Sequence, residues 1–183
     1  DRMTAVKVLL PDLASALGSK RFLREIQIAA QLRHPHILPL LDSGQVEGLP
    51  FYVMPYVEGE SVREKLTREK QLPISETLRI GMEVTDALSY AHGKGVVHRD
   101  IKPANVLVKE SGEVKLLDFG IAKLLEGGPE DLTRSGAMTP RYASPEQLLG
   151  KPISIASDIY QLGLLMSEVL GGGLPTEGET LTD

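Results

Sequence analysis

Two acidic side chains, an amide and a lysine lie close together in the middle of the chain. Asp100, Lys102 and Asn105 follow one another closely, and Asp118 comes a short distance later. Short apolar runs flank them at residues 95–97, 106–108 and 114–117. Because apolar runs of this length are typical of strands, we expect the polar side chains to lie in loops at strand ends.

Phosphoryl transfer is the reaction that needs this set of side chains. In that reaction the protein makes few bonds and mainly positions groups and neutralises the charge of a triphosphate. Asp100 can accept the proton of an attacking hydroxyl group. Asn105 and Asp118 offer the hard oxygen ligands that Mg²⁺ takes together with phosphate oxygens. Lys102 would then face the transferring phosphoryl group.

Residues 98–105, His-Arg-Asp-Ile-Lys-Pro-Ala-Asn, and residues 118–120, Asp-Phe-Gly, resemble the catalytic loop and magnesium loop of the protein kinase family. Either tripeptide alone, His-Arg-Asp or Asp-Phe-Gly, is more often a solvated turn or an Asx turn. Their conjunction, with Asn105 at its family spacing after Asp100 and a hairpin before Asp118, favours the catalytic interpretation. The resemblance implies an α+β, two-lobed protein-kinase fold that uses ATP and Mg²⁺.

The resemblance also implies a nucleotide site near the start of the chain. Lys7, in the apolar run 4–10, matches the strand lysine that holds the α- and β-phosphates, and Glu25 matches its helix partner. Taken alone, Lys7 could equally be a strand-edge lysine with its stem lying on the surface. The other cofactor-binding positions are Ala5 and Leu107, which would sandwich adenine, the gatekeeper Met54, and the hinge residues Pro55 and Val57.

Several residues match supporting positions of the family. The resemblance implies that His98 is a buried ring supporting Phe119, which precedes Gly120, and that Asp158 accepts hydrogen bonds from catalytic-loop N–H groups. Thr139 matches the threonine that binds the catalytic aspartate and lysine. Residues 144–146 replace the family's Ala-Pro-Glu, with Ser144 predicted as a helix N-cap and Glu146 lacking its usual arginine partner.

The long aperiodic stretch 121–139 resembles an activation segment. Arg99, next to Asp100, is a cation that could bind a phosphate group carried by Thr133 or Ser135. Charge-assisted hydrogen bonds of this kind order loops. The sequence therefore predicts regulation by phosphorylation.

Local patterns predict the surrounding elements. Strands are expected at 37–41 and 51–56, around a turn at 42–50, and a helix at about 75–92. One stripe of that helix is expected to be core: Leu78, Met82, Thr85, Leu88 and Ala91 or His92. Ser61 is better explained as an N-cap, with Glu64 completing a capping box, than as a ribose contact, which stays open.

Composition is that of an ordinary globular protein, with 183 residues, 42% hydrophobic and 25% charged. A net charge of -5 argues against a nucleic-acid partner and a polybasic membrane surface. No apolar run is long enough to span a membrane, and the absence of cysteine excludes disulfides and thiolate metal sites. ATP chemistry predicts a cytoplasmic location, although the parent protein could carry a membrane segment elsewhere.

The chain matches only part of the family domain. We expect a partial N-lobe at 1–56 and a partial C-lobe at 57–183, because no Gly-x-Gly-x-x-Gly loop is present and the helices after the last apolar helix are missing. Such a fragment would be weakly active or inactive. Lys102 favours Ser/Thr hydroxyls of protein substrates, and residues 54–59 and 142–147 look most like those of bacterial eukaryotic-like Ser/Thr kinases.

Two other functions remain open at this point. One is a non-catalytic binding or regulatory module built on a kinase-like fold. The other is a metal hydrolase that uses the four histidines, His34, His36, His92 and His98, although His34 and His36 lack a third ligand nearby in sequence.

Overall fold

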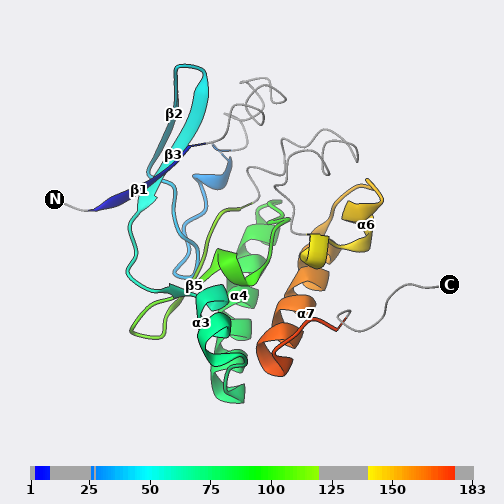
Figure 1. The fold of residues 1–183 in the computed structure, drawn as a ribbon. Coiled ribbons are helices and arrows are strands. Elements are labelled where there is room, and N and C mark those ends of the chain that lie inside the picture. The colour runs from blue at the N-terminus through cyan, green and yellow to red at the C-terminus, as the bar shows by residue number, and fades with distance from the viewer. Residues whose placement is uncertain (1–2, 9–25, 27, 120–139, 176–183) are drawn as a thin grey trace.

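A computed structural model of the chain describes residues 3–8, 26, 28–119 and 140–175. A small antiparallel sheet comes first, followed by a mainly helical part (Figure 1). The first sheet has the order β1-β3-β2, from β1 (Thr4–Val8), β3 (Leu49–Pro55) and β2 (Asp42–Val46). Its register places Lys7 opposite Tyr52 and Ala5 opposite Met54.

The predicted strand at 37–41 is wrong, because β2 begins only at Asp42. The turn between β2 and β3 is a tight one at Glu47 and Gly48, where φ is 51° and 81°. Two successive residues with positive φ are typical of a type I′ turn, whose twist matches that of the strands it joins. Because the turn is this short, the two strands of the hairpin extend into residues 42–46 and 49–50, which we had assigned to the loop.

Residues from the middle of the chain form a second antiparallel sheet. It has the order β4-β5-β6, from β4 (Glu60–Ser61), β5 (Val106–Val108) and β6 (Val114–Leu116). The predicted hairpin between Val108 and Val114 is confirmed by the pairing of those two residues. Beyond the hairpin, the Leu117 N–H donates to the Asn105 carbonyl at 2.8 Å, so the residue before Asp118 lies beside Asn105.

Several of the described helices begin at a side-chain cap. The helical elements are α3 (Val62–Glu69), α4 (Ile74–Gly93), η1 (Pro103–Asn105), η3 (Pro140–Tyr142), α6 (Pro145–Leu148) and α7 (Ile155–Gly171). Ser61 forms a capping box with Glu64 at the start of α3, which confirms the predicted cap. Ser144 caps α6 in the same way, and Pro145 follows at the first helical position, again as predicted.

The core lies between α4, α7 and the second sheet. The buried residues of α4 are Thr77, Ile80, Val84, Ala87, Leu88 and Ala91. The predicted core stripe of this helix is therefore largely wrong: Leu78 is 57% exposed and Met82 is 72% exposed. Because α4 carries apolar residues on two faces, periodicity could not decide which face packs against the sheet. None of the helices in the described part of the chain is long and apolar enough to cross a membrane.

Candidate active site

Asp100, Lys102 and Asn105 converge at the start of η1. The Asn105 side-chain N–H donates to Asp100 Oδ2 at 2.9 Å and to the Asp100 carbonyl at 2.8 Å. Lys102 Nζ lies 2.9 Å from the same Asp100 Oδ2. Pro103 at the first position of η1 turns the chain tightly enough for Asn105 to reach back to Asp100. Three of the four predicted catalytic residues, all but Thr139, are thus linked by hydrogen bonds and an ion pair.

Asp118 follows the β5–β6 hairpin, and its side chain pairs with residues of the first sheet. Its carboxylate receives Lys7 Nζ on Oδ2 at 2.5 Å and the Tyr52 hydroxyl on Oδ1 at 2.6 Å. Asp118 has a φ of 51°, a left-handed backbone conformation that residues other than glycine seldom adopt. The structure therefore brings Lys7 of the first sheet to the acid that follows the second sheet.

Tyr52 is the site residue that sequence reasoning missed. It is a buried residue of β3, and Lys7 Nζ lies 5.9 Å from the centroid of its ring. Burial, and then the adjacent Asp118 carboxylate, raise the pKa of the Tyr52 hydroxyl far above its ordinary value, so it stays protonated and donates. Only the strand register, which sets Tyr52 opposite Lys7, could have identified it.

The oxygen atoms at the site fit a magnesium ion. The Asn105 amide nitrogen, which cannot bind a cation, is directed at Asp100, and this leaves Oδ1 as the atom able to bind one. Asp118, the residue after the Leu117–Asn105 backbone contact, supplies a carboxylate. One carboxylate and one amide oxygen suit Mg²⁺, which takes few protein ligands when phosphate oxygens are present.

The loop that carries Asp100 is anchored on a buried carboxylate. Asp158 of α7 accepts from the N–H groups of His98 at 2.8 Å and Arg99 at 2.7 Å, and His92 Nε2 lies 2.7 Å from Asp158 Oδ2. Three polar partners compensate the desolvation of this carboxylate. The geometry is the one that the family resemblance implied for Asp158.

His98 is a fully buried ring, and burial lowers its pKa despite the nearby carboxylates. In its neutral form Nε2–H donates to the Leu117 carbonyl at 2.8 Å, and Nδ1 accepts from the Asp100 N–H at 3.2 Å. The ring centroid lies 4.6 Å from that of Phe119. His98 therefore connects the backbone on the Asp100 side to the backbone on the Asp118 side.

The predicted adenine-binding positions lie on β1 and β3 of the first sheet, in the connection after β3, and on β5. Pro55 ends β3 opposite Thr4, and Val57 follows in the connection to β4. Leu107 lies in β5 opposite Ser61. Met54 lines a small cavity together with Tyr52, Asp118 and Phe119. Their contacts with adenine stay a prediction.

Five predicted residues fall outside the part that the structure describes: Glu25, Gly120, Thr133, Ser135 and Thr139. Glu146, which lacks the family's usual arginine partner and could be solvated or find another one, accepts a hydrogen bond from the Ser157 hydroxyl. That bond lowers the pKa of the Glu146 carboxyl. Arg99 is placed next to Asp100 with a φ of 71°, and its predicted regulatory role is untested.

The four histidines do not form one cluster, and each ring has a hydrogen-bond or ion-pair partner. The His92 ring contacts Asp158, and the His98 ring contacts the Leu117 carbonyl and the Asp100 N–H. His36 Nδ1 lies 3.1 Å from Glu83 Oε2, and His34 Nε2 lies 3.3 Å from Asp86 Oδ2. Among the residues that the structure describes, no three His, Cys, Asp or Glu side chains are grouped to hold a metal ion. The geometry gives no support to the metal-hydrolase interpretation.

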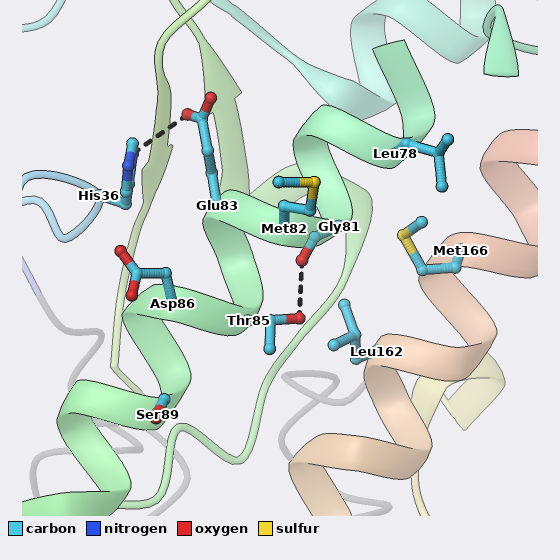
Figure 2. A pocket seen from close by; sticks show the side chains of 10 residues that line it. All are labelled: His36, Leu78, Gly81, Met82, Glu83, Thr85, Asp86, Ser89, Leu162 and Met166. Atoms are coloured by element: carbon cyan, nitrogen blue, oxygen red, sulfur yellow. Dashed lines mark hydrogen bonds and ion pairs between the residues drawn. The ribbon is translucent and has the colours of Figure 1, made fainter. Parts of the chain in front are cut away.

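A wide apolar pocket lies away from this site, between α4 and α7 (Figure 2). Leu78 and Met82 of α4 and Leu162 and Met166 of α7 line it. The helices approach closely there, since a Cβ on Gly81 would lie 2.7 Å from the Met166 methyl group. Leu78, Met82 and Thr85 of the α4 stripe that we had expected to be core therefore line a pocket instead.

Comparison with known proteins identifies the family. The sequence profile described as "Protein kinase domain" matches residues 1–183, so the chain belongs to the protein kinase family. This confirms the family and the α+β kinase fold predicted above. The division into lobes at residue 56 stays a prediction.

Its relatives include several bacterial serine/threonine-protein kinases. It is 39% identical over 98% of its length to PrkC of Bacillus subtilis, of which it covers 28%. It is 38% identical over 98% of its length to PknB of Mycobacterium tuberculosis, of which it covers 30%. A probable PknB of Lactococcus lactis is also 38% identical and is covered to 29%. The chain thus spans less than a third of the length of these relatives.

Proposed function

We propose that this chain is the catalytic part of a serine/threonine protein kinase, which transfers the γ-phosphate of ATP to Ser or Thr hydroxyls of protein substrates. One observation carries the proposal: Lys102 and Asn105 both bind the Asp100 carboxylate, and Asp118, paired with Lys7, follows the hairpin that starts directly after Asn105. Kinase chemistry depends on holding such groups in position rather than on covalent steps.

Each of these side chains has a separate task in the proposed reaction. Asp100 orients the acceptor hydroxyl and accepts its proton, and Asn105 holds Asp100 in place through its amide N–H. Lys102 neutralises charge on the transferring group next to Asp100. When bound, ATP with Mg²⁺ supplies the phosphoryl group, and Asn105 and Asp118 would hold the metal. Lys7 would hold the phosphates from the other side.

The location follows from the same proposal. A kinase of this type draws on the ATP of the cytoplasm, so we place the kinase part there. The acceptor proteins are those that present a Ser or Thr hydroxyl to Asp100.

Transfer of labelled γ-phosphate to a generic basic protein tests the proposal in the full-length gene product. The change Asp100→Asn should lower transfer about 10²- to 10⁴-fold, because it removes the base while keeping the shape of the side chain. Asp42→Asn, at an exposed position of β2, is the matched control and should leave transfer unchanged. Equal transfer by parent and Asp100→Asn would instead favour the non-catalytic binding or regulatory module.

A further inference from the structure

Two glutamine side chains lie buried against the catalytic loop and are not explained by the site described so far. Gln147 belongs to α6 and is 4% exposed, and Gln161 belongs to α7 and is 0% exposed. The Gln161 side-chain N–H donates to Gln147 Oε1 at 2.8 Å. A buried primary amide destabilises a fold unless its donors and acceptor are used, so the other partners of this pair are informative.

Gln161 holds the backbone on both sides of Asp100. Its Oε1 accepts from the Ile101 N–H at 2.9 Å, and its Nε2 donates to the Arg99 carbonyl at 3.2 Å. Asp158 lies one turn earlier on the same face of α7 and binds the N–H of Arg99. One face of α7 thus binds the peptide groups that precede and follow Asp100.

Gln147 reaches the same peptide from a different helix. Its Nε2 donates to the Arg99 carbonyl at 2.8 Å, and its Oε1 accepts from the Ser144 N–H at 2.9 Å. The Arg99 carbonyl therefore receives two amide donors, one from α6 and one from α7. Arg99 has a φ of 71°, a region that residues other than glycine adopt only when their surroundings hold them there.

We propose that Gln147 and Gln161 act as a pair of positioning residues for the base of the phosphoryl transfer. Together they fix the peptide between Arg99 and Asp100, and so the direction in which the Asp100 side chain leaves the backbone. Through Gln147, the pair also links α6 to the orientation of Asp100. This inference rests on the proposed function of Asp100.

Leucine substitutions test the pair, because leucine keeps a similar volume and removes the amide. In the full-length gene product, Gln161→Leu and Gln147→Leu should each lower kcat about 10- to 100-fold, since displacing a reacting group by about 1 Å has effects of this size. KM for ATP should stay within about two-fold, because neither residue contacts the predicted nucleotide positions. Ser157→Ala is the matched control: it removes another α7–α6 hydrogen bond, the partly buried one to Glu146, and a bond to the Ser154 N–H, but it does not touch the catalytic loop.

A variant with an ionisable side chain predicts a pH dependence of kcat, which a loss of stability alone would not produce. In Gln161→Glu, an ionised carboxylate would place an acceptor against the Arg99 carbonyl and Gln147 Oε1. Burial raises the pKa of such a carboxyl, and protonation restores a donor. The kcat of Gln161→Glu relative to the parent should therefore rise as the pH falls from about 8 to about 6.

Hydrogen exchange provides the measurement that does not depend on activity. Exchange of residues 98–101 should become faster in Gln161→Leu and stay unchanged in Ser157→Ala, because only the first change removes the acceptor of the Ile101 N–H. If leucine at these positions prevents folding, the pH dependence of Gln161→Glu takes its place as the test.

The results distinguish this inference from the proposed function. Transfer by the parent, with both leucine variants as active as Ser157→Ala, would overturn the inference and leave the kinase function standing. Absence of transfer in the parent would overturn the proposed function. In that case unchanged exchange at residues 98–101 would also refute the structural role of the pair, and faster exchange would support it.

Discussion

Lys7 Nζ and Asp118 Oδ2 form an ion pair at 2.5 Å, although 111 positions separate the two residues. Lys7 belongs to β1 of the first sheet and Asp118 follows β6 of the second. The pair therefore joins the first sheet to the segment that follows the second sheet (Figure 1). It also places a cation where the proposed reaction gathers phosphate and metal charge.

Lys7→Met should remove this cation and keep most of the side-chain volume. We expect kcat/KM for ATP in the full-length gene product to fall about 10²-fold, because a preorganised charge at the phosphates is lost. Lys151→Met, at an exposed lysine before α7, serves as the control and should leave kcat/KM unchanged. An unaltered kcat/KM in Lys7→Met would contradict the assigned role.

Tyr52→Phe should destabilise the protein by about 1–2 kcal/mol, because it deletes a buried hydrogen bond to the Asp118 carboxylate. Urea unfolding measures the change. Tyr56→Phe, at an exposed tyrosine, should have little effect. Equal free energies of unfolding for the two variants would show that the Tyr52 hydroxyl makes no stabilising contact.

The same tyrosine predicts a pH dependence of stability. Because the pKa of Tyr52 is raised in the folded protein, its contribution is fully present below the unfolded value of about 10 and is lost as the pH rises above it. The parent should therefore lose stability above about pH 10 more steeply than Tyr52→Phe does. Unfolding curves collected between neutral and alkaline pH measure both slopes, and parallel curves would contradict the assignment.

Asp158→Asn should destabilise the protein by about 3 kcal/mol, since an amide cannot accept from all three groups that bind this buried carboxylate. Asp86→Asn is the control at a largely exposed position and should change the free energy of unfolding by less than about 0.5 kcal/mol. A small effect at Asp158 would mean that the catalytic loop is held by other contacts.

Opposite faces of α4 should respond differently to truncation. Ile80→Ala removes a fully buried side chain and should cost about 3 kcal/mol, whereas Met82→Ala, at a mostly exposed residue, should cost under about 0.5 kcal/mol. Chemical denaturation of both variants checks this. The reverse order would restore the core stripe first predicted from the sequence.

Regulation by phosphorylation is tested by mass spectrometry after incubation of the full-length gene product with ATP and Mg²⁺. We propose that Thr133 or Ser135 becomes modified and that Arg99 binds the phosphate, so that Arg99→Ala should weaken activation. Thr67→Ala, in α3, is a control that should not affect modification of these residues. An active protein with neither residue modified would end this proposal.

Local sequence determined the parts of this protein that depend on near neighbours. Asp100, Lys102 and Asn105 are close in the chain, and the hairpin after them needs only a short turn to place Leu117 beside Asn105. The caps at Ser61 and Ser144 were predictable for the same reason, because a cap is decided within one turn of helix.

Only the tertiary structure decided what depends on distant packing. The register of β1 on β3 set Tyr52 opposite Lys7, and no local pattern specifies a register between strands so far apart in the chain. The side of α4 that is buried was decided by the sheet and α7, because both of its faces are apolar enough to pack. The contact between Gln147 and Gln161 likewise exists only because α6 and α7 meet at one peptide of the catalytic loop.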